Sequence, residues 1–260
     1  MRKTLIAALL AALIPIAARP VRAETVDLQL ILAADVSRSV DEDEFHLQRE
    51  GYAAALTNPK VLDAIQSGPH HAIAVSFIEW SGSDAQRVVA NWAIIRDEET
   101  GGVMANTLRT APRSFAGFTS ISAAIDFAMR HFAESGVSSE RRIIDISGDG
   151  TNNGGRPVTD ARDDAVAAGV TINGLAIVNL HPNPGFTAHT QPPGGIGTYY
   201  RENVAGGPGN FVIEIQDFST FAEAIVNKLV AEIAAADRAQ MTAKAAFAPL
   251  CCRAWPPDPG

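Results

Sequence analysis

The sequence predicts an α/β protein with a mostly parallel central sheet, one antiparallel edge strand and helices on both faces. Apolar runs of strand length alternate with helical segments along most of the 260 residues, which is typical of three-layer parallel sheets. Residues 26–34 form an apolar run such as a strand buried on both faces needs. Neither a linker nor an internal repeat divides the chain, and 47% hydrophobic residues suffice for one well-filled core. We therefore expect one domain over residues 24–245.

The N-terminal half of this domain continues from the first strand into a helix and a hairpin. Acidic residues in the first turn of residues 41–57 favour a helix there. Residues 71–80 and 85–95 are strands separated by the short turn "SGSD", so we expect them to pair antiparallel. Residues 97–110 have an ambiguous helical pattern, whereas Ser120 to Gly136 is predicted as a helix with a glycine cap.

The C-terminal half repeats the alternation of strand and helix. We expect a strand at 141–147, a helix at 158–168, strands at 170–178 and 211–215, and an Ala-rich helix at 218–245. A Pro/Gly-rich loop at 181–209 contains His181, His189, Tyr199, Tyr200 and Arg201. Such a long connection is functional or a floppy insertion, and both interpretations stay open.

The two ends of the chain fall outside the predicted domain. Arg2 and Lys3 precede an uncharged run to Ala18, and "VRA" at residues 21–23 suits signal-peptide cleavage before Glu24. We therefore expect a periplasmic or secreted protein, with an uncleaved N-terminal anchor as the alternative. Residues 246–260 are expected to form a flexible tail, in which the adjacent Cys251 and Cys252 are either plain thiols or a labile redox link.

The charge of the chain excludes several classes of partner. Removing residues 1–23 takes away four basic residues and no acidic ones, which changes the net charge from −8 to about −12. Nucleic acids and anionic membranes need a positive footprint, so neither is an expected partner. No second long apolar run follows the leader, and we therefore expect no membrane span after cleavage.

Oxygen-bearing side chains follow the first strand at alternate positions. Asp35, Ser37 and Ser39 lie in "DVSRS", directly after the apolar run. Loops that follow parallel strands meet at one edge of a sheet, so residues 147–156 and 179–209 should lie beside them. Carboxylate and hydroxyl oxygens suit Mg²⁺, although Ser39 or Asp41 could instead cap the following helix.

Two distant residues extend this pattern to a known arrangement. Thr119 stands immediately before a predicted helix, and Asp149 follows a predicted buried strand in "IIDISGDGTNNGG". The set Asp-x-Ser-x-Ser, Thr and Asp resembles the metal-ion-dependent adhesion site (MIDAS) of von Willebrand factor A (vWA) domains, and the order of elements over residues 25–235 resembles their Rossmann-like fold. The segments "DVSRSVDEDEFHLQREGYAAAL" and "YYRENVAGGPG" are also similar to an exported bacterial family of unknown function.

The resemblance implies a division of roles among these five residues. Ser37, Ser39 and Thr119 would contact Mg²⁺ or Mn²⁺ directly, while Asp35 and Asp149 would bind it directly or through water. An open position on the ion would then accept the carboxylate of an Asp or Glu from a protein partner. Phe118 replaces the glycine of many such domains and could narrow access. Arg38 could steer the carboxylate, or it is solvated or paired with a nearby acid.

Other chemistries have weaker support. Residues 149–160 partly fit a calcium-binding loop, but a strand precedes them and position 12 is Asp160 rather than Glu. Common nucleophile, phosphate-loop and zinc-protease motifs are absent, so we expect no enzyme activity. Asp145 lies mid-strand and is expected to be structural. The alternatives to metal-dependent partner binding are a metal-dependent hydrolase and a structural or assembly subunit with a vestigial metal site.

Overall fold

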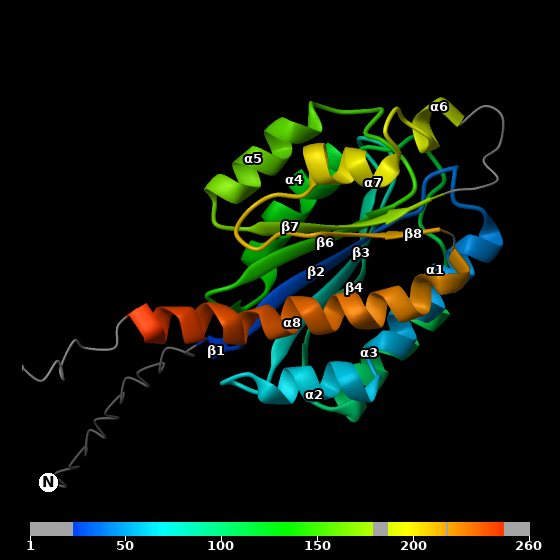
Figure 1. Cartoon of the computed structure of the whole chain (residues 1–260). Helices are drawn as coiled ribbons and strands as arrows, with labels where there is room; N and C mark the ends of the chain where they lie inside the picture. The colour runs from blue at the N-terminus through cyan, green and yellow to red at the C-terminus, as the bar shows by residue number, and fades with distance from the viewer. Residues whose placement is uncertain (1–22, 179–186, 217, 247–260) are drawn as a thin grey trace, which may run out of the picture.

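A computed structural model describes residues 23–178, 187–216 and 218–246 of the chain. Its main sheet has six strands in the order β4-β3-β2-β6-β7-β8, and only the β3–β4 pair is antiparallel. Helices cover both faces of this sheet, as Figure 1 shows. The predicted three-layer α/β fold with one antiparallel edge strand is therefore confirmed.

The strands of the main sheet follow the expected alternation along the chain. They are β2 (Leu28–Asp35), β3 (Ile73–Trp80), β4 (Gln86–Ile95), β6 (Arg142–Gly148), β7 (Thr171–Ile177) and β8 (Val212–Ile215). A second sheet of two short strands, β1 (Glu24–Thr25) and β5 (Val137–Ser138), was not expected from the sequence. Its strands are too short to give a periodic apolar pattern.

The helices divide between the two faces. One core layer packs the sheet against α1 (Glu42–Ala55), α2 (Pro59–Ser67), α3 (Glu98–Thr110) and α8 (Phe221–Ala246). The other layer packs it against α4 (Ile121–His131), α5 (Val158–Ala167) and α7 (Ile196–Tyr199). Alternate β2 residues serve the two layers, since Leu30 and Leu32 belong to the first and Ile31 and Ala33 to the second. This double burial explains why β2 is apolar throughout its centre.

Local capping explains most helix boundaries. Asp41 is the N-cap of α1, where its carboxylate accepts a hydrogen bond from the Glu44 N–H in a capping box. Helix α2 was missed by the sequence analysis, although the Asn58 side chain caps it and Pro59 opens its first turn. Helix α4 ends earlier than predicted, because a 3₁₀ turn at Phe132–Glu134 separates it from Gly136, whose φ is +68°.

The long connection between β7 and β8 is more ordered than the predicted loop. Its described part contains α6 (Thr187–Thr190), α7 and a π-helical turn at Tyr200–Val204. His181, residues 1–22 of the expected signal peptide and the tail with Cys251 and Cys252 lie outside the described residues. None of the helices in the described ranges combines the length and apolar character that a bilayer crossing requires.

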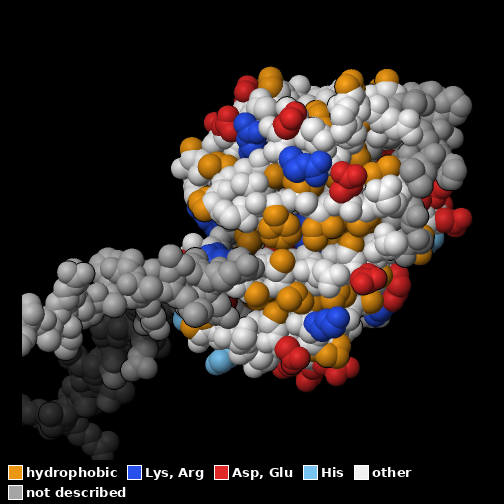
Figure 2. All heavy atoms as spheres, viewed as in Figure 1, with side chains coloured by type: hydrophobic (Ala, Val, Ile, Leu, Met, Phe, Trp, Pro, Cys, Tyr) orange, Lys and Arg blue, Asp and Glu red, His pale blue; other side chains and the backbone are white. Residues whose placement is uncertain are grey.

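The edge of the sheet opposite β4 lies at β8. In Figure 2, apolar side chains form a band over the region where Figure 1 draws β8 and α8, with acidic and basic side chains around it. At the centre of the sheet, Ala34 of β2 pairs with Ser147 of parallel β6. The chain segments that follow these two strands therefore leave the sheet side by side.

Candidate metal centre

The turn after β2 brings three of the expected oxygen donors together. Asp35 is the last residue of β2, and its Oδ1 accepts a hydrogen bond from the Ser37 N–H over 2.7 Å. The Oγ atoms of Ser37 and Ser39 lie 3.1 Å apart. All three side chains are buried. Because Asp41 caps α1, the Ser39 hydroxyl is not used as a helix cap.

The parallel pairing of β2 and β6 adds the fourth donor. Asp149 follows β6 directly, and its Oδ1 accepts a hydrogen bond of 2.6 Å from the Ser39 hydroxyl. The Asp149 side chain is fully buried. Residues 110 positions apart in the sequence are thus in contact, as the shared strand edge predicted.

Thr119 is held at the same edge by reciprocal hydrogen bonds. The Thr119 N–H donates to the Asn153 side-chain oxygen over 2.9 Å, and the Asn153 N–H donates to the Thr119 carbonyl over 2.8 Å. The neighbouring Gly117 carbonyl accepts from the Arg38 N–H over 3.0 Å. These bonds tie the loop before α4 to the segments after β6 and β2.

A pocket of about 30 Å³ opens between these segments. It is lined by Arg38, Ser39, Gly117, Phe118, Thr119, Asn153 and His189. One water molecule needs about 10–15 Å³ of such space, so the pocket has room for a small ion or water. Ser39 and Thr119 both border it, so these two expected hydroxyl donors share the same pocket.

The electrostatics of the site favour a cation. Burial raises the pKa of the Asp35 carboxyl well above its ordinary value, and the nearby Asp149 charge raises it further. Among the described residues, Asp35 Oδ2 has no hydrogen-bond partner although it is buried. The Arg113 charge partly lowers the pKa of Asp35, while the Arg113 Nη2 donates to the carbonyls of residues 36, 37 and 40. A divalent ion beside Asp35 would offset both the burial and the Asp149 charge that raise the pKa of this carboxyl.

The donor set fits an oxygen-seeking divalent ion better than a zinc site of the common His/Cys type. No group of three or more His, Cys, Asp or Glu side chains in the described part of the chain is arranged to hold a metal. The donors here are instead three hydroxyls and two carboxylates, which hard ions such as Mg²⁺ accept. We find that the residues present fit the ion that the sequence pattern implies.

The family comparison identifies the chain. Residues 25–237 match a family model described as "Protein of unknown function (DUF1194)". The chain belongs to the DUF1194 family. No curated protein matches it.

Solved structures resemble the DUF1194 chain in fold at low sequence identity. Proximal thread matrix protein 1 from the mussel byssus aligns with a TM-score of 0.58 and 16% identity, covering 82% of this chain and 49% of that one. A von Willebrand factor type A protein from Catenulispora acidiphila gives 0.52 and 15%, covering 81% and 43%. The pilus adhesin SpaC of Lactobacillus rhamnosus GG gives 0.58 and 11%, covering 82% and 31%. The chain spans half or less of each of these proteins, and the likeness establishes the vWA fold.

One of these relatives also has a described metal. A further structure of the mussel protein, with a TM-score of 0.57 and 16% identity, covers 82% of this chain and 49% of that one and has a "zinc occupied MIDAS motif". The five residues of the DUF1194 chain that the sequence predicts for such a motif are Asp35, Ser37, Ser39, Thr119 and Asp149. Hydrogen bonds join four of these, and Thr119 shares the small pocket with Ser39.

Three residues from the β7–β8 connection also reach this edge of the DUF1194 domain. His189 Nε2 lies 2.9 Å from Thr119 Oγ1, and burial lowers the pKa of its imidazole. Tyr199 Oη accepts a hydrogen bond of 3.1 Å from the Asn152 N–H. Tyr200 is fully buried, and burial together with the charges of Asp35 and Asp149 raises its pKa. The expected position of this connection after β7 was the only sequence signal for these contacts.

Gly148 allows Tyr200 and Asp35 to approach each other. A Cβ atom at Gly148 would lie 2.7 Å from Tyr200 Oη and 2.9 Å from Asp35 Oδ2, so only glycine fits without displacement. On the other side, the buried Gln48 of α1 donates to the Asp35 carbonyl over 3.3 Å. The end of β2 is thus enclosed by Tyr200 and Gln48, which were not predicted as site residues from the sequence.

The remaining sequence candidates have other surroundings. The Arg38 side chain is exposed at the rim of the pocket, and Phe118 beside it is 71% exposed. Asn153, a position of the alternative calcium loop, uses its side-chain oxygen to hold the Thr119 N–H. Asp160 lies in the first turn of α5. Asp145 is fully buried at the centre of β6, where the Lys228 ammonium contacts it over 2.7 Å.

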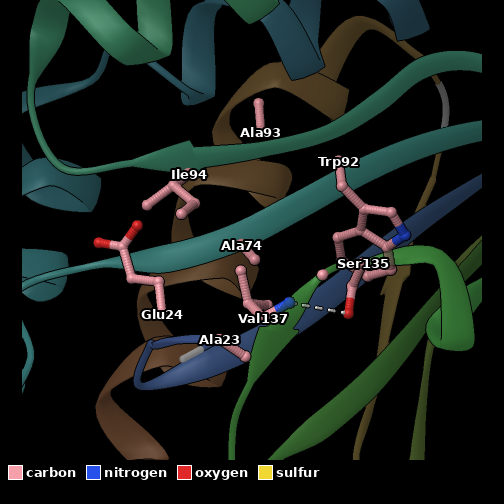
Figure 3. Close-up of a pocket in the computed structure, with 9 residues that line it drawn as sticks. Ala23, Glu24, Ala74, Trp92, Ala93, Ile94, Ser135 and Val137 are labelled. Atoms are coloured by element: carbon pink, nitrogen blue, oxygen red, sulfur yellow. Dashed lines mark hydrogen bonds between the residues drawn. The ribbon is translucent and has the colours of Figure 1, made fainter. Parts of the chain in front are cut away.

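Larger cavities lie at the other end of the strands. One of about 430 Å³ is bordered by Glu24, Trp92, Ile94 and Val137, and Figure 3 shows their side chains around it. Another of about 920 Å³ adjoins the first residues of β6 and β7. Neither contains any of the five expected metal ligands. The small pocket at the carboxyl edge therefore remains the candidate site, despite its size.

Proposed function

We propose that this DUF1194 protein is an exported interaction domain that binds a protein partner through a divalent cation, Mg²⁺ or Mn²⁺. The single observation that carries this proposal is the buried pair of Asp35 and Asp149 in contact with Ser37 and Ser39, at a pocket that Thr119 also borders. A cation at this point would offset the burial and the repulsion from Asp149 that together raise the pKa of Asp35. It would also give the buried Asp35 Oδ2 the partner that it lacks among the described residues.

The residues of this chain would hold the ion and leave part of its charge exposed. Ser37, Ser39 and Thr119 contribute neutral hydroxyls, while Asp35 and Asp149 contribute negative charge from the buried side. A bound divalent ion would supply positive charge at the pocket mouth, where an Asp or Glu carboxylate of the partner could enter its coordination sphere. The net charge of the chain is −8, so attraction of an acidic group depends on this local charge.

The size and the rim of the pocket favour a protein as the ligand over a small molecule. The pocket has a volume of about 30 Å³, which is too small for an organic substrate but large enough for the tip of a carboxylate bound to an ion. Phe118 is an exposed aromatic side chain at its mouth, and such residues are frequent anchors of protein interfaces. We therefore assign binding, not catalysis, to this site.

The relatives and the leader sequence support the same assignment. SpaC is described as a pilus adhesin, and the mussel protein as a matrix protein with a metal-occupied MIDAS motif. The basic and apolar segment before Glu24 supports export to the periplasm or beyond.

Metal titration tests the proposal directly. In calorimetry, the wild-type protein should bind Mn²⁺ or Mg²⁺, and Asp35→Ala should not. Asp27→Ala is the matched control, because Asp27 is a buried carboxylate just before the other end of β2. At a concentration of 100 times Kd, the metal should stabilise the wild type by about 2.7 kcal/mol over an EDTA sample.

Capture of partners from the native cell envelope tests the second half of the proposal. Proteins retained with Mn²⁺ should be released by EDTA and should be missing when Asp35→Ala is the bait. Retention that is equal under all three conditions would instead indicate the assembly subunit with a vestigial site.

A further inference from the structure

His189 lies on the wall of the small pocket, although it belongs to neither the strands nor the loops that carry the five expected ligands. It is part of α6, in the connection between β7 and β8. Its Nε2 is 2.9 Å from Thr119 Oγ1, and it borders the same space as Ser39 and Thr119. A nitrogen donor is thus available beside the oxygen donors.

The second ring nitrogen of the imidazole is fixed by a hydrogen bond, as is usual for histidines that bind metals. Its Nδ1 lies 3.0 Å from Thr151 Oγ1, and the Thr151 N–H donates to the His189 carbonyl over 3.1 Å. Histidines that bind metals usually have the second ring nitrogen fixed by such a hydrogen bond, which orients the ring and selects the tautomer. With a proton on Nδ1, Nε2 presents its lone pair toward Thr119.

Gly150 makes this position accessible to the ring. A Cβ atom at Gly150 would lie closer than van der Waals contact to His189 Nε2 and to the two ring carbons next to it. Gly150 directly follows Asp149, so the ring rests on the backbone of a residue adjacent to an expected ligand. Any larger residue there would push the imidazole out of the pocket.

The donor spacing is that of neighbouring ligands around one ion. Two ligands at right angles on an ion at 2.0–2.1 Å are separated by roughly 2.9 Å. The Ser37 and Ser39 hydroxyls are 3.1 Å apart, and Thr119 Oγ1 and His189 Nε2 are 2.9 Å apart. Thr119 and His189 can therefore contact a common ion with little rearrangement.

We propose that His189 is an additional metal ligand, and that the site consequently prefers a first-row transition ion such as Zn²⁺, Co²⁺ or Mn²⁺ over Mg²⁺. This inference rests on the proposed function and specifies the ion that it uses. Imidazole nitrogen binds Zn²⁺ and Co²⁺ strongly and Mg²⁺ poorly, whereas carboxylates, hydroxyls and water accept all of them. Removing the imidazole should thus change the order of affinities, not abolish metal binding.

Calorimetric titration of tag-free protein with Zn²⁺, Co²⁺, Mn²⁺ and Mg²⁺ tests this selectivity. His189→Ala should lose Zn²⁺ and Co²⁺ affinity by about 10–100-fold while Mg²⁺ affinity changes less than about threefold. Gly150→Ala should have the same effect, because its Cβ would displace the ring while all six proposed ligands remain. His46→Ala is the control, since His46 is an exposed histidine of α1.

Nitrogen NMR of the wild-type protein provides a readout that needs no variant to fold. Saturation with Zn²⁺ should shift one imidazole Nε2 resonance, and that resonance should be missing in His189→Ala. If no imidazole nitrogen responds, or if His189→Ala retains its Zn²⁺ affinity, His189 only hydrogen-bonds to Thr119 and the inference is wrong. The proposed function would survive that result, because its own tests are the loss of metal binding in Asp35→Ala and the release of the partner by EDTA.

Discussion

Gly148→Ala should weaken both folding and metal binding, because Gly148 is the point where Tyr200 and Asp35 come closest to the backbone of β6. The new Cβ would lie 2.7 Å from Tyr200 Oη, 2.9 Å from Asp35 Oδ2 and 3.1 Å from Asp35 Cβ. Contacts shorter than 3.0 Å are not tolerated, so at least one of the two side chains must move. Both are fully buried, and neither can turn into solvent.

The expected cost follows from this enclosure. Inserting a methyl group into a filled core usually costs about 1–3 kcal/mol, and two simultaneous short contacts place Gly148→Ala at about 2 kcal/mol or more. Tyr200→Phe removes the closer contact. Since the Tyr200 hydroxyl has no hydrogen-bond partner among the described residues, its loss alone should change the free energy of unfolding by less than about 1 kcal/mol.

A double-mutant cycle measures the contact itself. Urea denaturation in EDTA of the wild type, Gly148→Ala, Tyr200→Phe and the double variant should give a favourable coupling of about 1 kcal/mol. Calorimetry with Mn²⁺ should show weaker binding in Gly148→Ala and partial recovery in the double variant, because Asp35 remains in contact with the new methyl group. Zero coupling energy, or a stable Gly148→Ala with unchanged metal affinity, would refute this packing.

Two further predictions concern the buried charges and the pocket rim. Lys228→Met should destabilise the fold by about 3–5 kcal/mol, because Asp145 and Glu232 both lose their buried counter-ion. Burial raises the pKa of Asp145 to about 7 from 3.8, so its contribution to stability is complete below about pH 4 and is lost as the pH rises through 7. The Lys228→Met loss in urea denaturation should therefore be larger at pH 8 than at pH 5, and an equal loss at both would contradict the assignment. Phe118→Ser should leave the free energy of unfolding within about 0.5 kcal/mol of the wild-type value and leave metal affinity intact, yet weaken partner capture. Unchanged capture would show that Phe118 does not contact the partner.

The sequence predicted the parts of the fold that depend on local patterns. Apolar runs at β2 and β6 and the short turn before β4 located the strands, and parallel strands imply a shared edge for the loops after them. Helix α2 was missed because its apolar stripe is short, although Asn58 and Pro59 form a recognisable start. Asp41 and Ser39 were both plausible caps for α1, and only coordinates could assign the cap to Asp41.

The site was predicted less completely, since several of its contacts join distant segments. The Thr119–Asn153 hydrogen bonds and the position of His189 depend on how the connections between strands fold back, which no local periodicity records. Likewise, Asp145 was expected to be structural from its place mid-strand, but its partner Lys228 lies 83 positions later, on α8. The resemblance of five residues to a known motif supplied what spacing alone did not.

The paired hydrogen bonds between Thr119 and Asn153 couple the position of Thr119 to the positions of two helices, α4 and α5. Thr119 immediately precedes the N-cap of α4, and the Ser122 N–H donates to Asn152 as well. A displacement of the Thr119 hydroxyl toward an ion would therefore pull the start of α4 and the chain leading into α5 in the same direction. A ligand in the small pocket would therefore act, through these hydrogen bonds, on the helical layer that contains α4 and α5.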